Sequence, residues 1–231
     1  MVKKIIACFI AAGLFLICPA HAETFDELVV RLKAADQHYR DGSLGRAKEE
    51  CLAILKINPR FYPAYNILGG IYGSLGDNKN SKECLEKSVQ IKPEQPDIYK
   101  KLFYLASDAG ETDSCIEYLK KSGTYDPKNS EIDFNIAHLY LTKKNDYENA
   151  RKYYLESEKK NKNDAKTLFL IGATYLMQGD KNKAVDYVTK LRANNEAYLA
   201  LALETFMKTG MLTQNDPLLK ISSVLSMRDK H

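Results

Sequence analysis

The sequence predicts an all-α chain built from stacked repeats of 34 residues. Pro59, Pro93 and Pro127 follow one another at that interval. A small residue followed three positions later by Tyr also recurs, and this pair stands at Gly69 and Tyr72, at Ala137 and Tyr140, and at Gly172 and Tyr175. A period of this size is typical of solenoids, in which each unit buries its apolar face against the next.

The period, the small positions, the Tyr and the closing Pro resemble the tetratricopeptide repeat (TPR) family. The resemblance implies a right-handed αα-superhelix in which each repeat is a pair of antiparallel helices joined by a tight turn. It places five repeats within residues 23–195, and they are expected at 28–61, 62–95, 96–129, 130–164 and 165–195. Residues 196–228 are expected to form a degenerate sixth helix pair that caps the stack, with Pro217 opening its second helix.

Small residues mark the places where the paired helices turn and where they meet. A residue at positive φ closes a helix without a Cβ clash, and glycines stand at four of the expected turns, Gly42, Gly76, Gly110 and Gly179. The contact position on the second helix is small in every repeat, as Ala47, Ser81, Cys115, Ala150 and Ala184. Phe103 replaces the small residue of the first helix in the third repeat, so we expect those two helices to lie farther apart.

Residues 1–22 have the pattern of a secretory signal peptide. Two lysines precede an apolar run over 5–17, which is too short to span a bilayer as a helix. Small residues then lead to an expected cleavage site after Ala22. We therefore expect an exported protein, most simply a periplasmic one, with secretion or a lipid anchor at Cys18 as the alternatives.

Composition and motifs indicate no chemistry. The 34 basic and 30 acidic residues make no strong case for nucleic acid, and no stretch after the signal peptide is long and apolar enough to span a membrane. Neither HExxH, GxSxG nor a phosphate-binding glycine loop occurs, so we expect no enzyme, no cofactor and no metal. The mature chain keeps Cys51, Cys84 and Cys115 without a CxxC pair, and an odd number leaves at least one thiol unpaired within a monomer.

The TPR resemblance implies a groove, lined by the first helices of successive repeats, that binds an extended or helical peptide. The candidate binding residues at groove positions are Asp36, Asn66, Lys100, Tyr104, Phe134, His138 and Phe169. Asp97 and Glu131 stand at the second residue of repeats three and four, which is also a groove-facing position. The aromatic residues would anchor the partner and the polar ones would select it. In the alternative interpretation the C-terminal helices fill the groove, and the aromatic residues are core.

The sequence therefore predicts an exported, non-enzymatic TPR scaffold that binds a protein or peptide partner in its groove. Two alternatives stay open. One is an assembly factor for an envelope complex, of the kind that builds pili or outer-membrane complexes. The other is an accessory subunit of an enzyme system such as cytochrome maturation.

Overall fold

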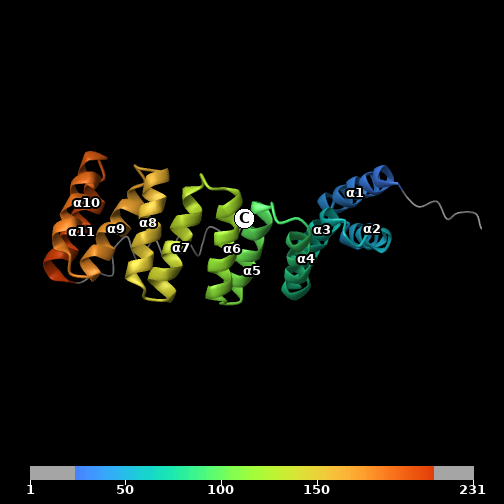
Figure 1. Ribbon diagram of the computed structural model, residues 1–231, viewed down its shortest axis with the longest axis horizontal. Helices are drawn as coiled ribbons and strands as arrows, with labels where there is room; N and C mark the ends of the chain where they lie inside the picture. The colour runs from blue at the N-terminus through green and yellow to red at the C-terminus, as the bar shows by residue number, and fades with distance from the viewer. Residues whose placement is uncertain (1–23, 211–231) are drawn as a thin grey trace, which may run out of the picture. The chain divides into compact units, whose positions relative to one another are not determined.

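A computed structural model describes residues 24–210 of the 231-residue chain, and this range is all-helical (Figure 1). The chain divides into two compact units, one ending at Pro93 and the other beginning at Glu94. The predicted fold class, an all-α array of helical hairpins, is confirmed. The predicted signal peptide, Cys18 and the part of the predicted cap after residue 210 lie outside the described residues.

The first unit consists of two helical hairpins. Its helices are α1 (Phe25–Arg40), α2 (Leu44–Ile57), α3 (Tyr62–Ser74) and α4 (Asn78–Ile91). Each helix contacts the next one in the chain, and α1 also contacts α3. A capping box begins α1: the backbone N–H of Glu27 donates to Thr24 Oγ1 over 3.4 Å, and the N–H of Thr24 donates to Glu27 Oε2 over 2.6 Å.

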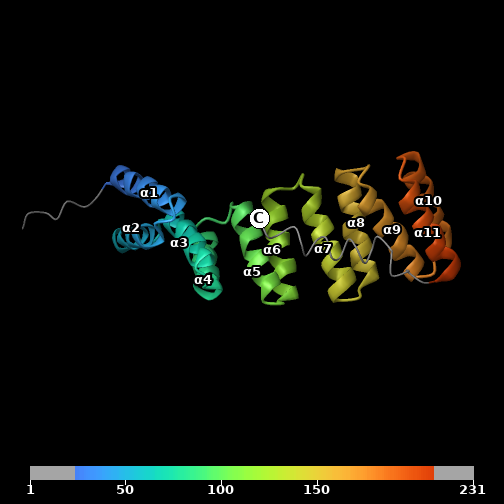
Figure 2. The same cartoon turned by 180° about the vertical axis from the view of Figure 1, so that it is seen from behind.

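The second unit continues the same pattern with seven helices that stand side by side in chain order (Figures 1 and 2). They are α5 (Pro96–Asp108), α6 (Thr112–Tyr125), α7 (Ser130–Lys143), α8 (Tyr147–Lys160), α9 (Ala165–Met177), α10 (Lys181–Ala193) and α11 (Ala197–Thr209). Helix α9, the first helix of its repeat, also contacts α11, the first helix of the next one. The odd number in the described range leaves α11 without a described partner helix, and its Tyr198 and Leu201 are exposed.

The turns between paired helices adopt left-handed backbone conformations. The four expected glycines, Gly42, Gly76, Gly110 and Gly179, have φ between 73° and 81°. In the turn between α7 and α8 this conformation belongs to Asn145, at φ 52°, because that repeat has no Gly there. Asn tolerates the left-handed region better than most residues, since its short polar side chain hydrogen-bonds locally.

Two glycines inside first helices allow a close approach of other helices. A Cβ on Gly69 would lie 2.5 Å from Cδ2 of Leu85 on α4, the second helix of the same repeat. A Cβ on Gly172 would clash with Leu203 and would lie 3.2 Å from Cβ of Tyr187. Leu203 belongs to α11. Gly172 therefore allows the close approach of two helices, α10 of its own repeat and α11 that follows it.

Buried serines tie second helices to the beginnings of first helices. The Ser122 hydroxyl donates to the carbonyl oxygen of Pro96 over 3.2 Å, and the Ser157 hydroxyl donates to that of Ser130 over 2.9 Å. These bonds satisfy buried hydroxyls that would otherwise cost stability. They fix the two helices of a repeat against each other at the end opposite the turn.

Basic side chains lie over tyrosine rings of the following repeat. Lys48 Nζ on α2 is 4.8 Å from the ring centroid of Tyr72 on α3. Arg151 Cζ on α8 is 4.6 Å from the ring centroid of Tyr175 on α9. A cation over an aromatic face at these distances is an attractive contact. The recurring Tyr therefore contributes to the stacking of successive repeats as well as to the packing within each one.

Among residues 24–210, no helix combines the length and the apolar character that a bilayer crossing requires.

Candidate functional site

The candidate residues of the first unit lie on α1 and α3. Asp36 is half-buried, and its carboxylate pairs with Arg40 Nη2 at 2.7 Å, one turn further along α1. Asn66 on α3 is also half-buried. The hydroxyl of Tyr39 lies 3.2 Å from Ser74 Oγ, and a Cβ on Gly70 would come within 3.0 Å of it. The Tyr39 ring therefore covers the face of α3 at Gly70 and leaves little open surface there.

In the second unit, Lys100 and Tyr104 line one cavity of about 100 Å³ between α5, α6 and α7. Its lining residues are Pro96, Asp97, Lys100, Phe103, Tyr104, Leu119, Ser122, Asp126, Asn129, Glu131, Ile132 and Asn135. Four of them were expected at groove positions, namely Asp97, Lys100, Tyr104 and Glu131. The structure thus brings three groove positions of repeat three and one of repeat four together around a single hollow.

The aromatic edge of this cavity is formed by consecutive residues of α5. The ring centroids of Phe103 and Tyr104 are 5.1 Å apart, with the rings tilted by 52°. Lys100 Nζ lies 6.0 Å from the Tyr104 centroid, one turn earlier on the same helix. Phe103 packs against the apolar cluster of Ile116, Leu119, Ile132 and Ile136. The large residue predicted to disturb the third repeat therefore forms part of the cavity wall.

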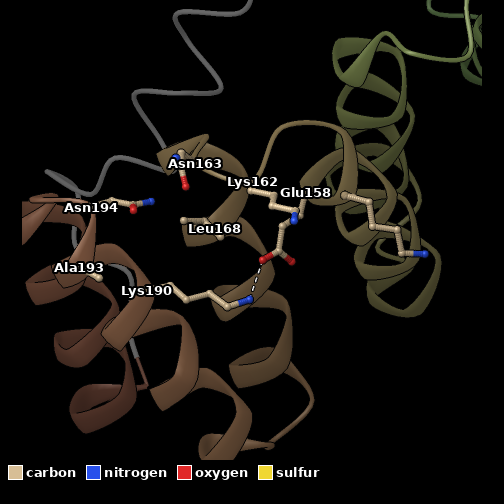
Figure 3. Close-up of a pocket in the computed structure, with 8 residues that line it drawn as sticks. Glu158, Lys162, Asn163, Leu168, Lys190, Ala193 and Asn194 are labelled. Atoms are coloured by element: carbon tan, nitrogen blue, oxygen red, sulfur yellow. Dashed lines mark hydrogen bonds and ion pairs between the residues drawn. The ribbon is translucent and has the colours of Figure 1, made fainter.

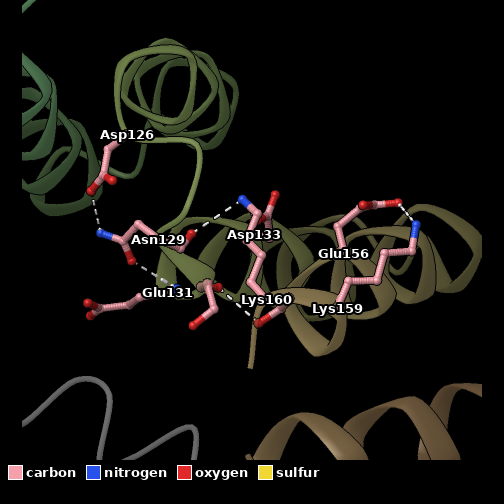
Figure 4. Close-up of polar contacts among 9 residues, drawn as sticks. Asp126, Asn129, Glu131, Asp133, Glu156, Lys159 and Lys160 are labelled. Atoms are coloured by element: carbon pink, nitrogen blue, oxygen red, sulfur yellow. Dashed lines mark hydrogen bonds and ion pairs between the residues drawn. The ribbon is translucent and has the colours of Figure 1, made fainter. Parts of the chain in front are cut away.

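The opposite edge of the cavity is a hydrogen-bonded chain in and after the loop from α6 to α7 (Figure 4). Asn129 Nδ2 donates to Asp126 Oδ2 over 2.9 Å, and the backbone N–H of Glu131 donates to Asn129 Oδ1 over 3.1 Å. Asn129 is also the N-cap of α7. Behind this chain, Lys160 on α8 pairs with Asp133 on α7. Both ends of the Asn129 amide are engaged, which holds the Asp126 carboxylate in place.

Phe134 and Phe169 belong to the hydrophobic core of the second unit. Their exposed fractions are 9% and 0%, and both lie in the cluster that also contains Tyr154 and Leu141. The Phe134 ring meets Tyr154 edge to face, with centroids 5.5 Å apart. Neither ring is therefore exposed among residues 24–210.

His138 extends this core cluster on α7. Its ring stacks on Phe134 with centroids 6.2 Å apart, and Nδ1 lies 3.3 Å from the Tyr154 hydroxyl, with which it shares a hydrogen bond. Burial lowers the pKa of His138, and the positive charge of Lys143 lowers it further. Burial also raises the pKa of Tyr154. Both side chains are therefore neutral near pH 7, and His138 is not placed as an exposed charged contact.

A second, wider hollow of about 440 Å³ lies where the ends of α8 and α10 meet the start of α9 (Figure 3). Its central carboxylate, Glu158, accepts a hydrogen bond from Lys190 Nζ at 2.6 Å and another from the Tyr187 hydroxyl at 3.1 Å. Burial, with the Glu158 charge beside it, raises the pKa of Tyr187. Glu158 thus joins α8 to α10, and we assign this hollow a structural role.

The three cysteines of the described range are free thiols that packing explains. Burial raises the pKa of Cys51 to about 12 and also raises the pKa of Cys84. Cys115 is buried at the contact of α6 with α5, where its thiol donates to the carbonyl oxygen of Phe103 over 3.8 Å. Within residues 24–210, His, Cys, Asp and Glu side chains form no group of three or more that would hold a metal ion.

The comparison with known proteins agrees with this geometry. The family model of the tetratricopeptide repeat matches residues 62–95 and 134–163. These segments are tetratricopeptide repeats. No protein with a curated function matches the sequence.

Solved structures share the fold at low sequence identity. The chain superimposes on a crystal structure of MamA with a TM-score of 0.58 and 18% identity, over 73% of this chain and 92% of that one. For YrrB, described as a TPR protein with an unusual peptide-binding site, the TM-score is 0.58 and the identity 18%, over 80% and 99% of the two chains. For MamA from Desulfovibrio magneticus RS-1 the values are 0.55 and 12%, over 76% and 98%. At these identities the likeness shows the fold.

Sequence reasoning missed four polar residues of the cavity, one of which, Ser122, lies on the second helix α6. Asp126 and Asn129 belong to the loop between α6 and α7, whereas groove positions were sought only on first helices. Asn135 stands on α7 one position beyond the expected groove residue Phe134. A signal for Asp126 and Asn129 was present, because Asn just before an amphipathic helix is a typical N-cap, and a capped loop is held in one conformation.

Proposed function

We propose that this protein is an exported, non-enzymatic scaffold that holds a segment of a partner protein against the first helices of its repeats. The repeat fold is that of a protein-interaction scaffold. The observation that carries the binding site is the cavity between α5 and α7, because groove positions of two successive repeats converge on it. Concave pockets of this kind, with a few polar groups around apolar walls, are the usual places for ligand contacts.

Two further features support the other parts of the proposal. Export is supported by the charge, apolar run and cleavage pattern of residues 1–22. The non-enzymatic role is supported by the absence of catalytic motifs from the sequence and by the half-buried, neutral state of His138. A catalytic His would need a reachable substrate and an orienting partner, and His138 instead stacks on the buried ring of Phe134.

Site-specific photocrosslinking in cells tests the proposal. A photoreactive benzophenone residue is placed in the full chain at Tyr104, which lines the cavity, and in a matched chain at Glu117, which is exposed on the second helix α6. We expect a discrete crosslinked partner from position 104 and none from position 117. The same gel reports export, because removal of residues 1–22 shortens the chain. No adduct at 104, or the same adducts at both positions, contradicts groove binding.

A further inference from the structure

We infer that the cavity between α5, α6 and α7 binds an arginine side chain of the partner segment. The inference rests on the proposed function and adds the chemistry of the residue that the scaffold recognises. It follows from the charge around the cavity, from its size and walls, and from the way its carboxylates are held.

The charge around the cavity favours a cation. Three carboxylates line it, those of Asp97, Asp126 and Glu131, against the single ammonium group of Lys100. Asp97 and Glu131 are exposed in the first turns of α5 and α7, and neither forms an ion pair within residues 24–210. Each helix N-terminus is equivalent to roughly half a positive charge. Together with Lys100 this leaves an excess of about one negative charge.

The size and walls of the cavity favour a guanidinium group. A cavity of about 100 Å³ admits the end of one side chain and is too small for a helix. Leu119 and Ile132 form apolar walls, and Phe103 and Tyr104 supply aromatic ones. A planar guanidinium stacks on aromatic faces and is weakly hydrated, whereas a lysine ammonium is compact and strongly hydrated.

The carboxylate within the loop is held in advance of binding. Asn129 occupies Oδ2 of Asp126, while its own amide oxygen is fixed by the first turn of α7 (Figure 4). A carboxylate already held in one orientation loses little conformational entropy when it accepts a hydrogen bond from a ligand. Planar N–H donors arranged as a fork match a carboxylate better than a point charge does.

Removal of Lys100 should change the binding affinity in opposite directions for a cationic ligand and for a carboxylate ligand. Its ammonium group lies beside the Tyr104 ring, on which an incoming guanidinium would stack. Removing Lys100 therefore relieves repulsion and should strengthen binding of a cation. If the cavity instead recognised a carboxylate, Lys100 would be the principal attractive group, and its removal would weaken binding.

The experiment titrates the purified protein with Nα-acetyl-arginine amide and follows its backbone amide resonances by NMR. The matched probes are the citrulline derivative, which has nearly the same shape without the charge, and the glutamate derivative. We expect saturable shifts in 96–104 and 126–135 with the arginine probe, at least fivefold weaker binding of citrulline, and no binding of glutamate.

Variants of exposed residues test whether the arginine probe binds in the cavity. Asp97→Asn with Glu131→Gln should weaken arginine binding about fivefold or more, whereas Lys100→Ala should tighten it about twofold. Asp108→Asn, an exposed α5 carboxylate away from the cavity, is the control and should change nothing. Equal binding of arginine by the double variant, or stronger binding of glutamate, overturns the inference.

This outcome is distinguishable from failure of the proposed function. A partner crosslinked at position 104, with no shifts caused by the arginine probe, would remove the inference and leave the scaffold function standing. Arginine-specific shifts in the absence of any crosslinked partner would support the cavity's chemistry and contradict the cellular role.

Discussion

Gly172 is the position where the packing makes its sharpest demand. A Cβ there would clash with Leu203 on α11 and would lie 3.2 Å from Cβ of Tyr187 on α10. Leu203 is fully buried, and the Tyr187 Cβ is attached directly to the backbone, so neither atom yields easily. We therefore expect Gly172→Ala to displace α11 or to force Leu203 out of its rotamer.

The expected magnitude follows from two opposing contributions. Overpacking of a close-packed core costs about 1–3 kcal/mol, while replacing Gly by Ala inside a helix contributes about 1 kcal/mol of stability. The net expectation is a loss of about 1 kcal/mol, and a melting temperature lower by about 2–4 °C for a domain of this size. Gly123→Ala is the matched control, since its Cβ would meet only Ile132 at 3.4 Å, an ordinary contact.

Thermal and urea unfolding, followed by far-UV circular dichroism, measure both variants. Hydrogen exchange adds the location, because protection in α11 should fall in Gly172→Ala and remain unchanged in Gly123→Ala. Leu203→Ala in the Gly172→Ala background removes the clash, so the double variant should lose less stability than the two single losses combined. Gly123→Ala should raise the melting temperature, because Ala is the better helix former. If Gly172→Ala raised it by the same amount, the close approach of α11 to α9 would be refuted.

Three further predictions concern single side chains. Arg151→Ala removes the nearer of the two cations over the Tyr175 ring, the other being Lys183, and should destabilise the stack by about 0.5–1 kcal/mol, measured by urea unfolding; an unchanged urea midpoint would show that the Arg151 contact adds nothing. Because the folded state lowers the pKa of His138 from its ordinary 6.5, the unfolded chain binds the proton more readily, so stability should be complete above pH 6.5 and fall as the pH drops below it. The comparison is of urea midpoints between pH 8 and pH 5, and His138→Gln should show a smaller decrease than the wild-type chain. A thiol reagent at pH 7.4 should modify half-buried Cys84 faster than buried Cys51, whose pKa is about 12, as followed by mass spectrometry; preferential labelling of Cys51 would contradict its placement.

Features that repeat along the chain were predictable because their causes are local. A left-handed turn needs Gly or Asn, and the expected turn at Gly76 has φ 74°. The capping box at Thr24 and Glu27 likewise depends only on residues three positions apart. The helical period and the small contact positions predict hairpins in the same way, because each hairpin is made by neighbours in the sequence.

The accessibility of the candidate site depended on contacts that no local pattern contains. Phe134 and Phe169 occupy the same groove register as Lys100, yet they are buried, because the helices around α7 and α9 close over them. Asp126 reaches the cavity through a loop whose course is set by the cap of α7.

The sequence by itself determined the helical hairpins and the register of each residue along them, because backbone conformation and helix periodicity depend on residues a few positions apart. The tertiary structure decided which of those residues surround a cavity and which belong to the core. Burial is a property of what packs against a side chain, and at Gly172 the helix that does so, α11, begins 25 residues further along the chain.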